Sequence, residues 1–241
     1  MTVKKAITFS FDDGVTQDIR LIQILNKYGL KATFNLNSSY LGCPGSLVRE
    51  NSVVSHYKVK AEEVKDLYAG HEVASHTLTH PALLCLPDDE VVRQVEEDRQ
   101  CLSSLVGYEV VGLAYPCGSH TVDERVMNLV RTKTGIRYAR GTVSSFSCDP
   151  PSDLIHFQPS VYIPYEWEKA QSMAEEFLAA SPNTPQIFYL WAHAYEFDVF
   201  HLWNRFEEFC KKIARQGDIF YGTNSEVLLS SDWSIPSNRR E

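Results

Sequence analysis

Side chains capable of metal binding or acid–base chemistry follow four of the short apolar runs in this chain. They are Asp12 and Asp13, His76 and His80, the Pro116-Cys117-Gly118 turn, and His193 with Glu196 and Asp198. The runs before them predict β-strands at residues 6–11, 72–74, 110–115 and 186–191. Because four strand ends carry carboxylates, imidazoles or a turn, the sequence indicates one composite site rather than separate features.

The two histidines are spaced His-x-x-x-His, from His76 to His80. Residues four apart are neighbours on a helix, so this spacing predicts two imidazoles on one face of a helical turn. Two imidazoles and a carboxylate form a three-ligand site suited to Zn²⁺, with a position open to water. Two ordinary surface histidines are the alternative, and the spacing lacks the His-Glu-x-x-His pattern of zinc peptidases.

Asp12 and Asp13 are adjacent carboxylates that precede Gly14. One interpretation is a solvated Asp-Asp-Gly turn, which is a common sequence at turns. The other is that one carboxylate binds the metal while its neighbour acts as a base, because adjacent side chains point in different directions. The spacing argues against a phosphatase-type pair, which commonly reads Asp-x-Asp.

Strands and amphipathic helices alternate along the chain. Further strands are predicted at 32–36, 136–140 and 219–221, and helices at 16–28, 61–69, 87–106, 122–131, 165–179, 200–216 and 225–229. About seven alternations predict an α/β fold, with parallel strands in a closed or nearly closed barrel and helices outside. Active sites in such barrels gather at the C-terminal strand ends. Residues 37–58 read as a long polar loop that would wall the site.

Composition and charge restrict the class of protein further. The 241 residues carry a net formal charge of −8, and 44% of them are hydrophobic. An acidic chain without a basic run is a poor binder of nucleic acid or anionic membranes, and no apolar run approaches the ~20 residues of a membrane span. The six cysteines form no C-x-x-C pair. The length predicts one domain over residues 1–241. Because scattered cysteines are typical of reduced packing residues and no signal peptide is recognisable, we expect a cytoplasmic protein.

Five segments together resemble the successive motifs of the NodB-like polysaccharide deacetylases, carbohydrate esterase family four. They are residues 10–14 (SFDDG), 70–81 (GHEVASHTLTHP), 114–118 (AYPCG), 190–193 (LWAH) and 220–226 (FYGTNSE). The resemblance extends from Ile7 to about Leu229, nearly the whole chain. It implies a distorted (β/α) barrel with a divalent metal, usually zinc, that removes acetyl groups from N-acetylated or O-acetylated sugars.

The resemblance also implies a role for each matched residue. The metal ligands would be Asp13, His76 and His80. Asp12 would be the catalytic base, and His193 the acid that protonates the departing amine. The backbone N–H of Cys117 would bind the oxyanion.

The chain departs from the family pattern at the third motif. The family often has an arginine, paired with the catalytic aspartate, where this chain has Ala114, and its loss should raise the pKa of Asp12 unless another cation replaces it. Arg140 is the candidate replacement, although we favour an exposed surface position for its side chain. Cys117 stands where the family usually has an aromatic residue, and no base is evidently dedicated to it as a nucleophile.

Several supporting residues are less defined by the pattern. The acid that should orient His193 has four candidates, Asp149, Asp153, Glu196 and Asp198. Residues expected near the substrate or behind the catalytic groups are Tyr115, Pro116, Arg140 and Glu196, with His120 the strongest candidate among the unpaired histidines.

Two other functions stay open beside the deacetylase. The same barrel and metal would suit a C–N hydrolase of a small cyclic amide or ureide. A non-catalytic carbohydrate-binding relative is the third interpretation, supported mainly by Ala114. The shape of the cleft separates polymer from small molecule, because an open groove suits a polymer and a closed pocket a small ligand.

Overall fold

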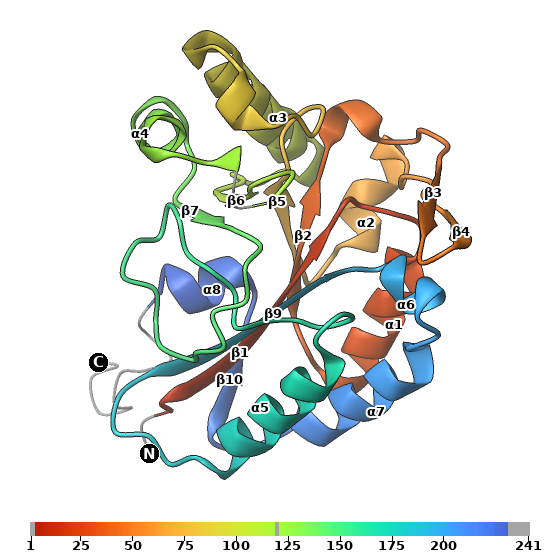
Figure 1. The fold of residues 1–241 in the computed structure, drawn as a ribbon, viewed down its shortest axis with the longest axis vertical. Helices are drawn as coiled ribbons and strands as arrows, with labels where there is room; N and C mark the ends of the chain where they lie inside the picture. The colour runs from red at the N-terminus through yellow and green to blue at the C-terminus, as the bar shows by residue number, and fades with distance from the viewer. Residues whose placement is uncertain (1–2, 119–120, 231–241) are drawn as a thin grey trace.

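A parallel β-sheet forms the centre of the protein, whose structure is a computed structural model that describes residues 3–118 and 121–230 (Figure 1). The strand order is β7-β6-β5-β2-β1-β9-β8, and β10 pairs with β1 outside this path. The strands are β1 (Lys5–Asp12), β2 (Ala32–Leu36), β5 (Glu72–Ser75), β6 (Gly112–Ala114), β7 (Tyr138–Arg140), β8 (Val161–Tyr162), β9 (Gln186–His193) and β10 (Ile219–Tyr221). All of these pairings are parallel, as the alternation of strands and helices predicts.

Strands β1 and β9 form the middle of the sheet, and they pair along the whole length of β1, from Lys5↔Gln186 to Asp12↔His193. Every residue of β1 is buried, which fits a parallel strand covered on both faces. On the other side, the first half of β1 pairs with β10 and the second half with β2. Because β10 and β2 share one edge of β1, the sheet splits there and curls.

The sheet curls into a distorted barrel that is nearly closed, which confirms the predicted fold class. The segment between β7 and β8 connects the two ends of the sheet. Phe157 forms a β-bridge with Arg140 of β7, and β8, which follows it, pairs with β9. The Gly141 amide donates to the Phe157 carbonyl at 2.7 Å, and the Ser160 amide to the Tyr189 carbonyl at 2.8 Å. This bridging segment places β7 and β9 around one interior.

Helices cover the outside of the sheet, as predicted. They are α1 (Asp18–Tyr28), α2 (Val64–Leu67), α3 (Asp88–Val106), α4 (Glu124–Lys133), α5 (Trp167–Ala179), α6 (Glu196–Val199), α7 (Trp203–Ile213) and α8 (Asn224–Leu228). Helix α7 packs against both α1 and α5, and α3 packs against α4 (Figure 1). Single-turn 3₁₀ helices lie at Ser38–Tyr40, Ala61–Glu63 and Leu83–Cys85. No helix of the described residues has both the length and the apolar character needed to cross a membrane.

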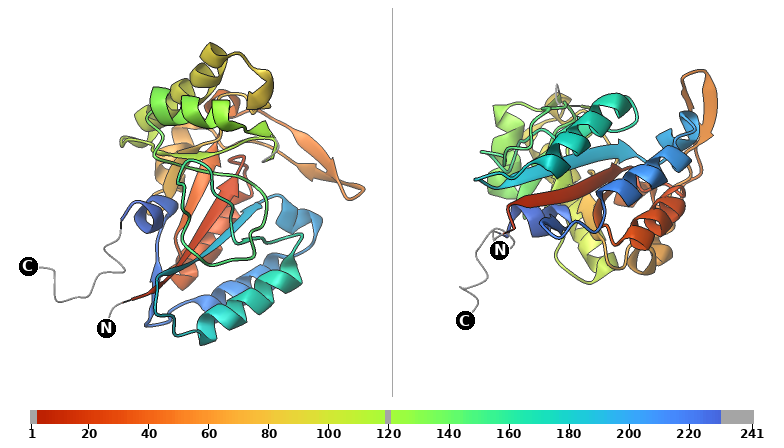
Figure 2. Two further views of the ribbon diagram at one scale, coloured as in Figure 1. Left: turned by 60° about the vertical axis from the view of Figure 1, so that its left-hand side comes forward. Right: turned by 90° about the horizontal axis from the view of Figure 1, so that it is seen from below.

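The interpretation of residues 37–58 as a loop is wrong in part. The segment contains an antiparallel hairpin of β3 (Ser46–Arg49) and β4 (Ser52–Ser55), which projects from the body of the protein (Figure 2). Glu50 and Asn51 make its turn with φ angles of 46° and 60°, the left-handed conformation that two-residue hairpin turns prefer. The strands are short and mostly exposed, so the sequence contains no apolar run that would predict them. The sequence also did not predict β8, which has two residues, or the single-turn helix α6.

Gly112 tests the packing inside the barrel, because a Cβ added there would overlap the ring of Tyr138, which is fully buried. We expect Gly112→Ala to lower the free energy of unfolding by about 1–3 kcal/mol, the cost of overpacking a core. Gly217→Ala is the matched control, because nothing lies within 4 Å of its added Cβ. Urea unfolding of both variants measures the difference, and equal stabilities would contradict this packing.

Candidate metal centre and active site

Asp12 and Asp13 lie at the C-terminal end of β1, and the backbone sends their side chains in different directions. Asp13 has a φ of 82°, a left-handed conformation that is uncommon outside glycine, and its amide donates to the Asn35 carbonyl at 3.0 Å. Asp12 is 2% exposed and accepts a hydrogen bond of 2.7 Å from the Asn35 side chain inside the barrel. The two carboxylates therefore have separate surroundings, as the split-role interpretation requires.

Arg140 is the main partner of Asp12. The prediction that Arg140 lies on the surface is wrong: its side chain is 1% exposed and forms an ion pair with Asp12 Oδ1. Arg140 Nε also donates to Ser10 Oγ at 3.1 Å, and the guanidinium lies 4.6 Å from the ring centroid of Trp191. Burial works to raise the pKa of Asp12, but Arg140, with His76 and His193, lowers it below the usual value. Arg140 thus supplies the cation that is missing at Ala114.

Asp13 is held by two residues that the sequence analysis did not select, His56 and Lys58. Lys58 Nζ donates to the Asp13 carbonyl at 2.6 Å and lies 3.3 Å from Asp13 Oδ1. His56 Nε2 lies 3.1 Å from Asp13 Oδ2. Burial works to raise the pKa of Asp13, but His56 and Lys58 hold it well below its usual range. Residues two apart share a face in extended chain, and this spacing is the signal that could have paired His56 with Lys58.

His76 and His80 come together, although not on a helical turn as predicted. They lie in the loop after β5, where Thr77 and His80 have φ angles of 67° and 54° that no α-helix contains. Asn37 fixes this loop by donating to the His76 and Thr77 carbonyls at 2.6 and 2.8 Å. The imidazole centroids of the two histidines are 4.7 Å apart. The loop therefore brings the rings together without a helix.

Asp13, His76 and His80 fit a divalent metal ion. Each offers a ligand atom, and these atoms lie within 4.8 Å of one another. His76 Nδ1 donates to the Ala114 carbonyl at 2.8 Å, which leaves Nε2 with its lone pair, buried and without a hydrogen-bond partner among the described residues. Burial lowers the pKa of His76 to about 4 and also lowers that of His80, so both are neutral at pH 7, the form that binds metal.

His193 is the last residue of β9 and reaches the opposite side of the centre, with Nε2 4.0 Å from Asp13 Oδ2. Its Nδ1 forms an ion pair with Glu196 Oε1 at 3.1 Å, and its amide donates to Glu196 Oε2 at 2.9 Å. The Tyr162 hydroxyl donates to the same carboxylate. Burial alone would lower the pKa of His193, but Glu196, with Asp13 and Asp12, raises it to about 9.

Glu196 is therefore the acid beside His193, and the other three candidates lie elsewhere. Asp149 accepts from Ser147, and Asp153 pairs with Arg131 at 2.7 Å. Asp198 accepts from the indole nitrogen of Trp203 at 2.7 Å. Glu196 occupies the first turn of α6 and is 2% exposed, whereas a first-turn acid that serves only the helix dipole needs no burial.

The third motif borders the centre on the side of His80. Cys117 has a φ of 62°, and its Sγ lies 3.5 Å from His80 Nδ1. Tyr115 is buried and donates to the Ile155 carbonyl at 2.9 Å, while the Pro116 carbonyl accepts from Thr121 at 2.8 Å. The oxyanion role of the Cys117 amide stays a prediction. His120 lies outside the described residues.

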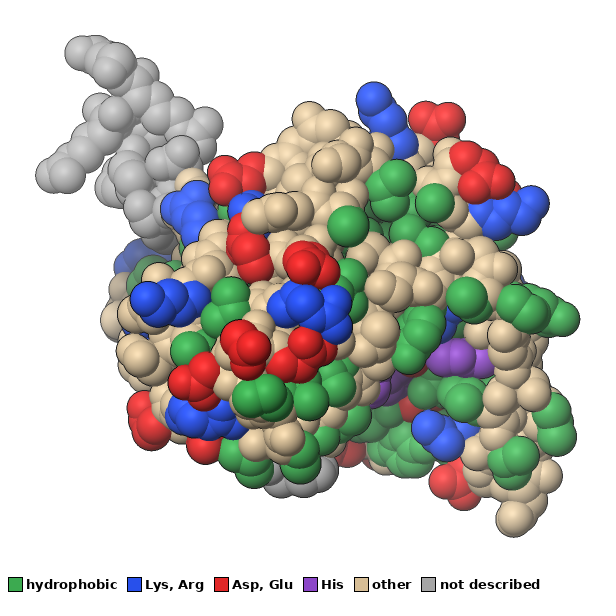
Figure 3. Space-filling view, turned by 90° about the horizontal axis from the view of Figure 1, so that it is seen from above, with side chains coloured by type: hydrophobic (Ala, Val, Ile, Leu, Met, Phe, Trp, Pro, Cys, Tyr) green, Lys and Arg blue, Asp and Glu red, His purple; other side chains and the backbone are tan. Residues whose placement is uncertain are grey.

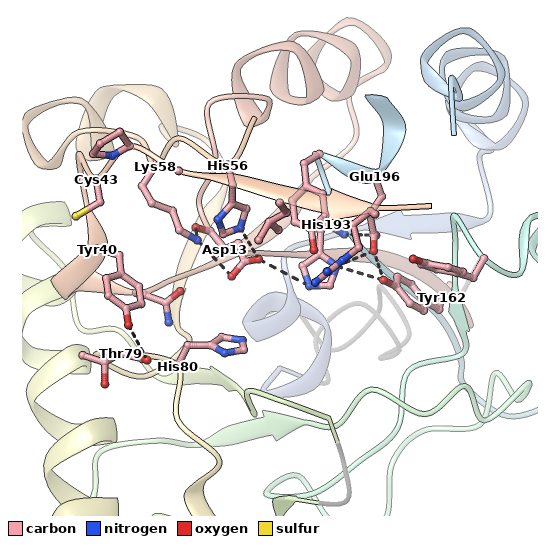
Figure 4. A pocket seen from close by; sticks show the side chains of 17 residues that line it. Asp13, Tyr40, Cys43, His56, Lys58, Thr79, His80, Tyr162, His193 and Glu196 are labelled. Carbon is pink, nitrogen blue, oxygen red and sulfur yellow. Dashed lines mark hydrogen bonds and ion pairs between the residues drawn. The ribbon is translucent and has the colours of Figure 1, made fainter. Parts of the chain in front are cut away.

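A cavity of about 810 Å³ opens beside these groups and is walled by the 37–58 segment, as predicted (Figures 3 and 4). Figure 4 shows Asp13, His80 and His193 around its base, with Tyr40 and His56 from the wall and Tyr162 across from them. Histidine side chains are visible in the corresponding hollow of the surface in Figure 3, between hydrophobic side chains. A second cavity of about 300 Å³ contains Asp12, His76 and Cys117 and shares His80 and His193 with the first.

Comparisons with known proteins identify the family of this chain. A family model described as polysaccharide deacetylase matches residues 1–139. The peptidoglycan-N-acetylglucosamine deacetylase PgdA of Listeria monocytogenes is 29% identical over 118 residues, 48% of this chain and 22% of that protein. A chitin deacetylase of a Pestalotiopsis species is 32% identical over 107 residues, 44% of this chain and 32% of that protein. A family 4 carbohydrate esterase from Streptomyces lividans, solved with acetate, superposes with a TM-score of 0.55 at 15% identity, over 91% of this chain and 93% of that one.

The chain belongs to the polysaccharide deacetylase family, because the family model covers more than half of it. The family resemblance drawn from the motif segments is thereby confirmed. The Streptomyces structure shows the same fold over nearly the whole of both chains. The matched segments cover only 22% and 32% of the length of the Listeria and Pestalotiopsis proteins.

The pKa of His193 tests the arrangement around it. We expect Glu196→Gln to lower this pKa from about 9 in the metal-free protein, because the burial that lowers it would remain while its strongest opposing charge is lost. In the wild type, the stability contributed by protonated His193 is complete below pH 6.5 and is lost as the pH rises through about 9. NMR titration of the His193 ring signals measures the shift, with exposed Glu208→Gln as control. A His193 that titrates unchanged in Glu196→Gln would contradict the arrangement.

Proposed function

We propose that this chain is a metal-dependent hydrolase that removes acetyl groups from N-acetylated sugars, with water cleaving the amide bond to acetate and a free amine. The observation that carries the proposal is the buried, unpartnered Nε2 of His76, close to ligand atoms of Asp13 and His80. Membership of the polysaccharide deacetylase family supports the same reaction class. Asp13, His76 and His80 would hold the ion, for which Zn²⁺ is the best match to one carboxylate and two imidazoles.

Side chains and one backbone amide near the proposed metal ion would act as base, oxyanion donor and acid. A divalent ion at this position would polarise the acetyl carbonyl and lower the pKa of a water molecule to about 7. Asp12, which Arg140 keeps ionised and whose Oδ2 lies 3.9 Å from His76 Nε2, accepts the proton of the attacking water. The Cys117 amide donates to the developing oxyanion. His193, oriented by Glu196, gives a proton to the departing amine.

The two alternative functions differ in how well the structure fits them. A non-catalytic relative rested mainly on Ala114, and the buried Asp12–Arg140 ion pair removes that support. A hydrolase of small cyclic amides gains from the cavity shape, because the hairpin closes one side of the site and leaves a pocket in the size range of small-molecule sites. Assays for acetate release and for ring opening, run on the same preparation, separate this hydrolase from the deacetylase.

His76 tests the metal centre directly. We expect His76→Ala to lose at least 10-fold in affinity for Zn²⁺, because the variant lacks one of three ligands. Calorimetric titration of the metal-free proteins measures the affinity, and His156→Ala, outside the centre, is the control. Equal affinities of wild type and His76→Ala would exclude this centre.

Asp12 tests the catalytic assignment. We expect Asp12→Asn to lower kcat for acetate release from N-acetylglucosamine oligomers by about 10²–10⁴-fold while the metal content stays unchanged, because the variant has lost the base but keeps Asp13, His76 and His80. Asp149→Asn removes an exposed carboxylate far from the centre and serves as the matched control. Circular dichroism checks that Asp12→Asn is folded. A folded Asp12→Asn protein with wild-type kcat would rule out this role.

A further inference from the structure

One strand of the projecting hairpin presents alternate residues to the large cavity. Leu47 and Arg49 of β3 line it, as does Gly45 just before the strand, whereas Val48 is 67% exposed and pairs across the hairpin with Val53, which is 78% exposed. This is the alternation that a β-strand imposes on its two faces. Arg49 is exposed to solvent, and its side chain lines the same cavity as Asp13 and His80.

The charges that line the cavity do not cancel. The carboxylate of Asp13 is paired with Lys58, and the Glu196 carboxylate is held by His193 and Tyr162. Arg49 is the remaining Lys or Arg among the lining residues, and no salt bridge of the described residues includes it. Arg49 Nη1 donates instead to the neighbouring Val48 carbonyl at 3.2 Å. One guanidinium in the wall is thus left without an anionic partner.

The surroundings of Arg49 suit a sugar-sized ligand. Four tyrosines line the same cavity, Tyr40, Tyr162, Tyr165 and Tyr195, and aromatic rings are common at surfaces that bind both apolar and polar groups. The guanidinium lies close enough to the Tyr195 hydroxyl to oppose the rise in its pKa that burial causes. A planar guanidinium presents two parallel N–H donors, the geometry that matches carboxylate and phosphate oxygens.

We propose that Arg49 determines specificity by binding an anionic substituent, a carboxylate or a phosphate, on the acylated substrate. This rests on the proposed function in that the acyl group of the same molecule lies at the metal centre. Lys58 does not serve this purpose, because its ammonium group already donates to the Asp13 carbonyl and forms an ion pair with Asp13 Oδ1. The hairpin thus does more than form a wall of the cavity. It selects one class of substrate, small acylated sugars that carry one negative group.

Three probes that share one acetylated amine test the proposal. They are N-acetylglucosamine, N-acetylmuramic acid, which adds a carboxylate, and N-acetylglucosamine 6-phosphate. We expect the wild type to have a kcat/KM at least about tenfold higher for one charged probe than for the neutral one, and Arg49→Gln to remove most of that ratio. Arg49→Lys, which keeps the charge but not the paired donors, should retain part of it. The probe that shows the preference identifies carboxylate or phosphate.

The control is Arg137→Gln, because Arg137 is exposed and lies before β7, at the opposite end of the strands from the site. This variant should keep the wild-type ratio. Equal treatment of charged and neutral probes by the wild type would overturn the proposal, as would a loss in Arg49→Gln that is the same for all probes.

Binding without turnover separates this proposal from the proposed function. In the Asp12→Asn background, calorimetry should show tighter binding of the preferred charged probe than of N-acetylglucosamine, and Arg49→Gln should abolish that difference. If no probe releases acetate, the proposed function fails, while the binding difference still supports the assignment of Arg49. If wild-type protein releases acetate but the Asp12→Asn/Arg49→Gln double variant keeps the difference in affinity seen in Asp12→Asn, the assignment of Arg49 fails and the proposed function stands.

Discussion

Two neighbouring carboxylates taken out of water at the end of β1 impose the main constraint on this structure. Asp12 and Asp13 cannot share one partner at close range, because like charges in a low-dielectric interior repel strongly. The left-handed backbone of Asp13 separates them, and each then has its own buried cation, Arg140 or Lys58. Removing one member of such a buried pair leaves an uncompensated charge, which costs about 3–5 kcal/mol.

These cations come from segments far from β1 in the sequence, so the fold and the site depend on each other. Arg140 ends β7, and Lys58 follows the hairpin and bridges Val15 in an antiparallel pair just beyond the aspartates. The curled parallel sheet brings the C-terminal ends of β1, β5, β7 and β9 to one rim, where carboxylates, imidazoles and the guanidinium meet. An open, flat sheet with the same strand order would leave Arg140 several strands away from Asp12.

Local patterns predicted much of the fold and the centre of the site. The alternation of apolar strands and amphipathic helices was sufficient to predict the barrel. The position of polar residues at strand ends was sufficient to predict that Asp12, Asp13, His76, His80 and His193 are neighbours. The prediction that the two histidines lie on a helical turn was wrong, because a spacing of four residues is compatible with a helix but does not require one. The loop instead depends on Asn37, which donates to it from another strand end.

The remaining site residues depend on contacts between distant segments. The burial of Arg140 and the pairing of Lys58 with Asp13 follow from sheet curvature and from the hairpin, neither of which has a period in the sequence. Glu196 is close to His193 in sequence, but its inward orientation follows from the one-turn helix α6, which is too short to predict. For the same reason, the wall that carries Arg49 was expected only as a loop.

The proposed reaction requires that Asp13, His76 and His80 bind a metal ion next to Asp12. A crystal structure of the protein with Zn²⁺, with data collected at the zinc absorption edge, tests this claim most directly. We predict one strong anomalous peak at about 2.0–2.2 Å from a carboxylate oxygen of Asp13 and from one nitrogen of each histidine. A peak bound by other residues, or a zinc-containing crystal with no peak between these three side chains, would contradict it.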